Sequence, residues 1–260
     1  MHPALNIAIT AAREAADIIM RYTHRLDKVI VKQKAKHNYY SEVDIKAEEA
    51  IIKILAKSFP EHGFIAEESG SKNADADYVW IIDPLDGTTN YLHSYPYYCV
   101  SIALKHKSRM ECAVVFDPVK QEFFTAARGQ GARLNDRRLR VATNKNDLSS
   151  ALMGTNFSFK KHLEPSLVNF FHEVADLSAG VRKTGAAALE IAYVAANRID
   201  GFVGFNLCPW DIAAGLLIMQ ESGGMISDLS GEKDPLNSGE IIAGAPKIVK
   251  EITNIFNHQE

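Results

Sequence analysis

The sequence is poor in cysteine and has no long apolar run. Its 260 residues include only three cysteines, Cys99, Cys112 and Cys208, and their separation gives neither a CxxC pair nor a disulfide framework. No apolar run approaches the ~20 residues that span a bilayer, and the first residues lack the basic segment and cleavage site of a secretory signal. We therefore expect a cytoplasmic protein that does not associate with a membrane.

The chain also lacks an excess of either charge. It carries 29 Lys and Arg against 32 Asp and Glu, for a formal net charge of -3. We find no basic block of the kind that forms a nucleic-acid-binding arm, so bulk electrostatics do not favour nucleic acid as the main partner. With 47% hydrophobic and 23% charged residues, the composition is that of a globular chain with a large core, which excludes a disordered chain, a collagen and a coiled-coil rod.

Hydrophobic periodicity predicts two halves, 1–143 and 144–260, joined at a polar stretch into one compact unit. The first half opens with an amphipathic helix over about 4–22 and a second helix that begins at the capping box Ser41-Glu42-Val43-Asp44. A Lys-rich turn or hairpin lies between the helices, and short aromatic and β-branched runs then predict strands. Those strands are expected at 64–66, 78–82, 97–104, 113–116 and 122–124. The second half is expected to alternate strands (151–154, 181–183, 201–205, 225–227, 241–243) with helices (162–177, 186–196, 211–221 and beyond Pro246), which indicates layered helices and sheets.

The most informative segment is Asp83-Pro84-Leu85-Asp86-Gly87-Thr88-Thr89-Asn90, directly after the strand predicted at 78–82. Pro84 ends the strand geometry and Gly87 permits a tight turn, so Asp83 and Asp86 lie on one loop. Two like charges at close range repel by ~4 kcal/mol at an effective dielectric near 20, so a site that holds both ionised needs a cation. Carboxylates with a backbone carbonyl favour Mg²⁺ over Zn²⁺. If Gly87 and Thr88 open a helix, their N–H groups would face an anion, which indicates phosphate.

Each acidic residue also has a simpler structural interpretation. An aspartate in an Asp-Gly turn is usually a cap, although six fixed positions of the string would coincide by chance with a probability on the order of 10⁻⁵. Glu67, in Glu67-Glu68-Ser69-Gly70, follows a short strand and fits either a solvated loop or the same cation cluster. Asp211, in Trp210-Asp211, begins an apolar helix and fits either an N-cap or a ligand.

The order and spacing of these three segments resemble the inositol monophosphatase family of Mg²⁺-dependent, lithium-sensitive phosphatases. Asp83–Asn90 matches the D-P-[LI]-D-G-[ST]-x-N signature, Glu67-Glu68-Ser69 matches an upstream element, and residues 210–224 (WDIAAGLLIMQESGG) match the C-terminal signature. The resemblance covers essentially the whole chain and looks closest to bacterial members. It implies an α+β fold, a layered α-β-α-β-α sandwich, and usually a homodimer. Residues 1–143 would carry the metal-binding motifs and residues 144–260 would complete the active site.

The resemblance also implies a ligand set for Mg²⁺. Glu67, Asp83 and the carbonyl of Leu85 would hold one ion. Asp83, Asp86 and Asp211 would hold a second, and Glu67 would contribute to a weaker third. Two such cations can clamp the attacking and leaving oxygens of an in-line phosphoryl displacement, so no Ser, Cys or His nucleophile is required.

The catalytic and substrate-binding roles come from the same resemblance. Thr88 and Asp44 would orient and deprotonate the attacking water, with Glu67 completing the catalytic group. Asp44 also has a structural interpretation, because it occupies the fourth position of the predicted capping box. The substrate would contact the residues Asp86, Gly87, Thr88, Ala187 and Asp211.

Two departures from the family pattern concern the substrate. Relatives usually carry a glutamate that binds inositol hydroxyls seven residues before the aspartate of the W-D motif, and here that position is Gly204. Loss of such a partner costs a buried hydroxyl about 1–3 kcal/mol, so inositol specificity is in question while the phosphate chemistry is not. The loop before Asp44 also differs, so Lys36 and Tyr39 could contact another substrate. Lys34 fits either phosphate steering or a solvated loop.

The sequence therefore predicts a phosphomonoesterase that uses Mg²⁺ to hydrolyse a small polyol or sugar phosphate. Alternatives within the same chemistry are a fructose-1,6-bisphosphate, nucleotide 3′-phosphate or histidinol-phosphate phosphatase. A second class is a non-catalytic regulator that acts through RNA or the transcription machinery, as some bacterial relatives do. The expected partners are a small phosphorylated metabolite and a second copy of the chain, with nucleic acid or the transcription machinery as a secondary possibility.

Overall fold

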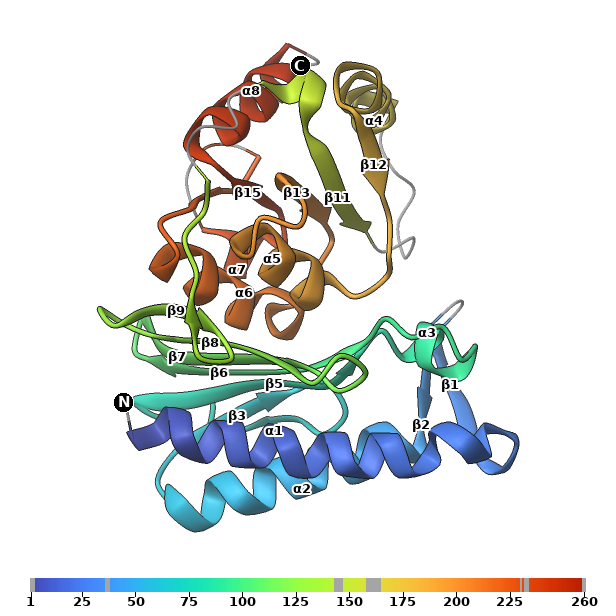
Figure 1. The fold of residues 1–260 in the computed structure, drawn as a ribbon. Coiled ribbons are helices and arrows are strands. Elements are labelled where there is room, and N and C mark those ends of the chain that lie inside the picture. The colour runs from blue at the N-terminus through green and yellow to red at the C-terminus, as the bar shows by residue number, and fades with distance from the viewer. Residues whose placement is uncertain are drawn as a thin grey trace.

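The computed structural model describes residues 3–35, 38–142, 147–157, 165–229, 231 and 234–258. Figure 1 shows helices and sheets stacked in layers, with the N-terminal helices on one outer face and the C-terminal helix on the opposite side. The successive layers are two helices, a first sheet, two inner helices, a second sheet and two outer helices. This is the α+β sandwich with α-β-α-β-α layers that the sequence predicts.

The first layer consists of α1 (Pro3–Tyr22) and α2 (Glu42–Ser58), which pack against each other. Leu5, Ala12 and Ile19 recur at helical spacing along α1 and are all buried. The predicted capping box is present at the start of α2, where Ser41 is the N-cap residue. The apolar faces of both helices share one core with the near face of the first sheet.

The first sheet has eight strands in the order β10-β9-β8-β7-β6-β5-β3-β4, and only β3 and β5 pair in parallel. Side chains alternate between its faces, because Trp80 and Ile82 join the core under α1 and α2 while Ile81 joins the core under the inner helices. The strands are β3 (Gly63–Ala66), β4 (Gly70–Lys72), β5 (Tyr78–Asp86), β6 (Cys99–His106), β7 (Arg109–Asp117), β8 (Glu122–Ala127), β9 (Gly131–Leu134) and β10 (Arg137–Arg138).

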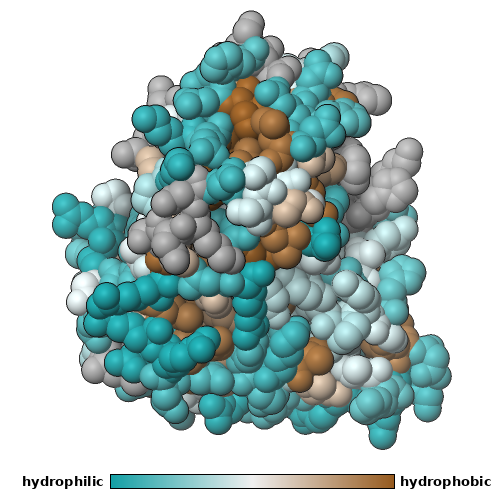
Figure 2. Space-filling view, turned by 45° about the horizontal axis from the view of Figure 1, so that its top comes forward, coloured by the Kyte–Doolittle hydropathy of each residue, from teal (hydrophilic) through white to brown (hydrophobic). Residues whose placement is uncertain are grey.

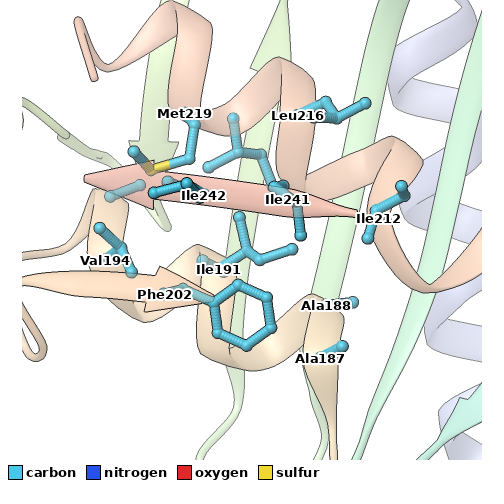
Figure 3. Packing of buried hydrophobic residues seen from close by; sticks show 14 of the residues in the cluster. Ala187, Ala188, Ile191, Val194, Phe202, Ile212, Leu216, Met219, Ile241 and Ile242 are labelled. Carbon is cyan, nitrogen blue, oxygen red and sulfur yellow. The ribbon is translucent and has the colours of Figure 1, made fainter. Parts of the chain in front are cut away.

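The two inner helices, α5 (Ala187–Ala195) and α6 (Pro209–Glu221), lie between the sheets and contact each other. Both are apolar around most of their circumference, as expected for helices buried on all sides. Figure 3 shows Ile191 and Val194 of α5 and Leu216 and Met219 of α6 packed around Ile241 and Ile242 of the second sheet. The inner helices therefore join the two sheets through one continuous core.

The second sheet has five strands in the order β12-β11-β13-β15-β14, with β11 parallel to both of its neighbours and the other pairs antiparallel. The outer helices α4 (Pro165–Leu177) and α8 (Pro246–Asn257) cover its far side and contact each other. The strands are β11 (Leu152–Phe157), β12 (Gly180–Arg182), β13 (Gly201–Phe205), β14 (Met225–Ser227) and β15 (Ile241–Gly244).

The remaining elements are short. A hairpin of β1 (Val31–Ala35) and β2 (Asn38–Ser41) occupies the Lys-rich stretch, which confirms the hairpin alternative. The other elements are the 3₁₀ helices η1 (Thr23–Lys28) and η2 (Leu148–Ser150) and the helices α3 (Thr88–Leu92) and α7 (Pro235–Ser238). None of the helices in the described part of the chain combines the length and the apolar composition needed to span a bilayer.

The predicted elements are all present, with differences at their ends. Strands β5, β6 and β7 run further than the apolar runs that predicted them, because polar residues such as Asp83, Lys105 and Glu111 continue the strands. Helix α6 begins at Pro209, two residues before the predicted start. The proposed boundary between the halves falls largely on residues 143–146, which lie outside the described residues, so the division into 1–143 and 144–260 stays a prediction. Figure 2 shows a mainly hydrophilic surface with hydrophobic residues in scattered areas.

Candidate active site

The Asp83–Asn90 segment forms the end of β5 and the start of α3. The ladder between β5 and β6 is regular up to Asp83 and shifts in register before Asp86, and this irregularity contains Pro84, which has no N–H to donate. Gly87 then adopts a left-handed conformation with φ +97°, and a Cβ at this position would lie 3.0 Å from the carbonyl oxygen of Tyr97. The local sequence therefore places an irregularity between the two aspartates, both of which remain paired with β6.

Four carboxylates from separate parts of the chain line one cavity of about 150 Å³. Glu67 follows β3, Asp83 and Asp86 lie at the end of β5, and Asp211 lies in the first turn of α6. The structure thus brings together all four acidic residues that the sequence places in a cation site. The complete lining consists of Tyr39, Glu67, Asp83, Leu85, Asp86, Gly87, Thr88, Thr89, Gly185 and Asp211.

The surroundings of this cavity disfavour ionisation of its carboxyl groups. Burial raises the pKa of Asp83 well above its usual value, and the nearby negative charges of Glu67, Asp86 and Asp211 raise it further. Burial likewise raises the pKa of Asp86, with Asp211 as the largest contribution from a neighbouring charge. Because only 2% of Asp83 and 7% of Asp86 is exposed, solvent cannot compensate these charges, and a positive ligand is needed to keep them ionised together.

Backbone amides hold three of the carboxylates in place. Asp83 Oδ1 accepts a hydrogen bond of 3.0 Å from the N–H of Leu85, and Asp86 Oδ2 accepts one of 2.7 Å from Ala188 at the start of α5. Asp211 Oδ2 accepts one of 2.7 Å from Cys208, so Asp211 occupies the N3 position of a capping box rather than the N-cap. Each of these three carboxylates is therefore held by a backbone N–H group of the fold.

The donor set fits a hard divalent cation. It consists of four carboxylates and the carbonyl of Leu85, which are the oxygen ligands that Mg²⁺ prefers. In the side-chain positions of the described residues, no group of three or more Asp, Glu, His or Cys side chains is arranged to hold a metal ion. The carboxylates line the same cavity, so small side-chain rotations toward a bound cation are required to complete such a site.

Thr88 and Asp44 form the pair that the family resemblance implies. The Thr88 hydroxyl donates to Asp44 Oδ1 over 2.7 Å, and its oxygen lies 3.0 Å from the carbonyl oxygen of Leu85. Asp44 Oδ2 accepts from both the N–H and the hydroxyl of Ser41, at 2.8 and 2.6 Å. Burial raises the pKa of Asp44, which makes this carboxylate a better proton acceptor. Asp44 is therefore placed to take part in a proton relay through the Thr88 hydroxyl, while it also caps α2.

The second half of the chain contributes a wall that sequence reasoning missed. Asn90 Nδ2 donates to the carbonyl oxygens of Tyr97 and Thr184, both at 2.7 Å. Glu190 Oε1 accepts from the N–H of Thr184 at 3.2 Å, so the two side chains hold the same residue beside Gly185. Burial raises the pKa of Glu190 to about 8. An acid within the otherwise apolar α5 was the available sequence signal.

Of the other residues predicted to contact the substrate, only some line the cavity. Tyr39 lines the cavity, whereas Ala187 is buried with 1% exposure and is not part of the lining. Gly204 lies within β13 in the core, where a Cβ would approach Leu207 Cδ1 to 2.6 Å, and it is also not part of the lining. Lys36 and the side chain of Lys34 lie outside the described residues.

Comparison with known proteins agrees with this fold. The inositol monophosphatase family model matches residues 1–259. Nus factor SuhB of Pseudomonas aeruginosa is 48% identical over 265 residues, which covers 99% of this chain and 97% of that protein. The crystal structure of extragenic suppressor protein suhB from Bartonella henselae superimposes with a TM-score of 0.92 at 37% identity, covering 97% of this chain and 98% of that one. For the inositol monophosphatase from Anabaena (Nostoc) sp., the TM-score is 0.86 at 33% identity, with coverage of 98% and 95%. The chain belongs to the inositol monophosphatase family.

Proposed function

We propose that the protein is a Mg²⁺-dependent phosphomonoesterase that acts on a small polyol or sugar phosphate of the inositol monophosphate type. The observation that carries this proposal is that four carboxylates line one cavity of about 150 Å³ together with Thr88, whose hydroxyl donates to Asp44 behind it. Membership of the inositol monophosphatase family supports the same reaction class. Fructose-1,6-bisphosphate, nucleotide 3′-phosphates and histidinol phosphate are alternative substrates with the same chemistry.

The residues of the cavity divide into binding and proton-transfer roles. Glu67, Asp83, Asp86 and Asp211, with the Leu85 carbonyl, would hold Mg²⁺. Bound there, Mg²⁺ neutralises phosphoryl oxygens and lowers the pKa of water. Phosphate monoesters hydrolyse extremely slowly without a catalyst, so the activation barrier is high. Charge neutralisation by the bound cation would remove a large part of that barrier.

The Thr88 hydroxyl positions the attacking water, and Asp44 accepts its proton through that hydroxyl. This direction of transfer follows from the hydrogen bond of 2.7 Å between Thr88 Oγ1 and Asp44 Oδ1 and from the raised pKa of Asp44. The N–H groups of Gly87 and Thr88 lie at the cavity wall and would receive the phosphate oxygens. The leaving alcohol would extend from the cavity past Tyr39.

The test is phosphate release from a panel of phosphomonoesters by the purified full-length protein. We expect release from at least one polyol or sugar phosphate with Mg²⁺, none with EDTA, and inhibition by Li⁺. Asp83→Asn should lower the rate by several orders of magnitude with an unchanged circular dichroism spectrum. Asp75→Asn, which makes the same change at an exposed position, should leave the rate unaltered. Release that needs no Mg²⁺, or that persists in Asp83→Asn, contradicts the proposal.

A second candidate function is regulatory. The relative from Pseudomonas aeruginosa has the name of a Nus factor rather than of a phosphatase, which favours action through the transcription machinery. Such a role does not need the cation cavity. We therefore expect Asp83→Asn to bind purified RNA polymerase as tightly as the unchanged protein in biolayer interferometry. If neither protein binds, the regulatory candidate is wrong.

The assembly and the compartment are part of the same proposal. A homodimer is the state that the family resemblance implies, and sedimentation velocity of the purified chain tests it through a species near twice the monomer mass of 28.7 kDa. The cytoplasm is the compartment in which a partner in transcription and a phosphorylated metabolite would both be met. A secreted or membrane-bound pool in cell fractionation would contradict that location.

A further inference from the structure

One edge of the first sheet carries a concentration of positive charge that the mechanism does not use. Residues 128–140 contain five arginines and a single acidic residue, although the whole chain has a net charge of -3. Four of them form what we call the arginine ribbon, on β9, on β10 and directly after β10, and all four side chains are exposed. They are Arg133, Arg137, Arg138 and Arg140. Other residues separate most of these arginines, so the sequence shows no continuous basic block.

Three carboxylates near the ribbon are already engaged by other groups, whereas Asp136 lies within the ribbon segment itself. Glu111 forms an ion pair with Arg128 at 3.2 Å. Glu122 accepts hydrogen bonds from both terminal nitrogens of Arg198. Glu221 accepts the N–H groups of Gly129 and Gly131 at 2.8 and 2.7 Å. Within the described residues, none of the four ribbon side chains forms an ion pair. Arg133 Nη1 donates to the carbonyl oxygen of Asp136 at 3.1 Å, so the guanidinium groups that remain available to an anion are those of Arg137, Arg138 and Arg140.

The ribbon residues also repel one another. Arg138 is the direct cross-strand partner of Arg133 in the β9–β10 ladder, which places two like charges on the same face at a cost in stability. Arg137, Arg138 and Arg140 line a surface groove of about 380 Å³ together with Leu139, Ala196 and Asn197. An anionic ligand in this groove would offset the repulsion.

The chemistry of the groove selects the class of partner. A protein interface needs apolar or aromatic anchors at its centre, but Leu134 and Leu139 of this segment are buried. Guanidinium groups match phosphate oxygens bidentately. The three positions from Arg137 to Arg140 span about 10 Å of extended chain, which suits a few successive phosphates of one strand. Leu139 is buried and its N–H donates to the carbonyl oxygen of Ala132 in β9, so the segment lies along the sheet edge and would contact a strand that follows the same edge.

We propose that the arginine ribbon binds the phosphodiester backbone of single-stranded nucleic acid without sequence preference. The inference deepens the regulatory candidate function and is independent of the phosphatase activity, since the ribbon and the cation cavity share no residue. Contacts of this type release counterions, so the affinity depends steeply on salt.

The experiment measures binding of a fluorescent 20-nucleotide oligouridylate to the full-length protein by fluorescence anisotropy at several salt concentrations. The test variant replaces Arg137, Arg138 and Arg140 with glutamine. Loss of three phosphate contacts should reduce the slope of log K against log salt by about 2 and weaken binding ~100-fold at 0.1 M salt. A variant with lysine at all three positions should retain most of the slope.

A matched control variant removes the same number of positive charges at another basic groove. Arg21, Arg25 and Lys53 line a cavity of about 590 Å³ between α1 and α2, which also contains Glu49. Replacing these three with glutamine should change the affinity less than ~3-fold. Equal loss in the control shows that only net charge matters and overturns the proposal. It is also overturned if the unchanged protein does not bind the oligonucleotide, or prefers duplex DNA or an acidic peptide of equal charge.

Discussion

Replacement of Asp83 by asparagine should stabilise the metal-free protein while it abolishes metal binding. Asparagine has the same shape, and its Oδ1 can still accept the hydrogen bond of 3.0 Å from the Leu85 N–H. What it removes is one of four acidic charges around a buried cavity. Unit charges 4 Å apart repel by ~4 kcal/mol at an effective dielectric near 20, and relaxation reduces this, so we expect a gain of roughly 1–3 kcal/mol. At about 2–4 °C per kcal/mol, the melting temperature in EDTA should rise by roughly 2–12 °C.

The raised pKa of Asp83 also determines how the stability of the metal-free protein depends on pH. The pKa of Asp83 is raised in the folded protein, so the unfolded chain loses this proton first as the pH rises. Stability from this group is therefore full below the ordinary carboxyl pKa of ~4 and is lost as the pH rises from there to the raised folded value. The melting temperature of the metal-free protein should fall across that window, and Mg²⁺ should restore it most at the higher pH. Asp83→Asn should show a smaller fall and no increase with Mg²⁺.

Asp117→Asn is the matched control for this assay. Asp117 is fully buried, but it accepts hydrogen bonds from the N–H groups of Val119 and Lys120 and from the Lys120 ammonium, at 2.9, 3.0 and 3.0 Å. Loss of this satisfied charge should cost about 1–3 kcal/mol, a change of opposite sign. If both variants lose stability in EDTA, the carboxylates of the cavity do not repel each other and the argument for a cation fails.

Three further substitutions test other parts of the account. Asn90→Asp loses both donations of 2.7 Å, including the one to Thr184, and should cost about 2–4 kcal/mol in urea unfolding; an unchanged midpoint contradicts this. Thr88→Val removes the hydroxyl that donates to buried Asp44, and should lower kcat at least ~10²-fold while it costs about 1–3 kcal/mol of stability. Gly204→Glu should lower the melting temperature, because its Cβ would lie 2.6 Å from Leu207 Cδ1, and a second change, Leu207→Ala, should recover part of the loss.

The parts of the fold that local chemistry determines could be predicted from the sequence. The capping box at Ser41 depends on residues within one helical turn, and it is present. The strand at Trp80 could be recognised because residues buried on both faces give a continuous apolar run. The ends of elements were less certain, since Pro209 opens α6 through an N1 position that the apolar pattern alone does not reveal.

In the candidate site, too, local features could be predicted from the sequence and long-range contacts could not. The Asp83–Asn90 string contains its own turn chemistry, so the loop and its ligands could be named in advance. The contact between Asp86 and the Ala188 N–H spans 102 positions of sequence, and no local pattern encodes such a pairing. Asn90 was visible as part of the string, but its role as a bridge to Thr184 depends on how α5 packs against the first sheet. The packing around Gly204 could not be predicted either, because crowding by Leu207 appears only in the folded chain.

The central claim is that Glu67, Asp83, Asp86 and Asp211 bind divalent cations in one cavity. A crystal grown with Mn²⁺ in place of Mg²⁺ tests it directly, because anomalous scattering identifies the ion and its ligands. The account predicts at least one manganese peak in this cavity, coordinated by Asp83 and by at least one other of the four carboxylates. A crystal soaked to saturation that shows no anomalous peak there would contradict it.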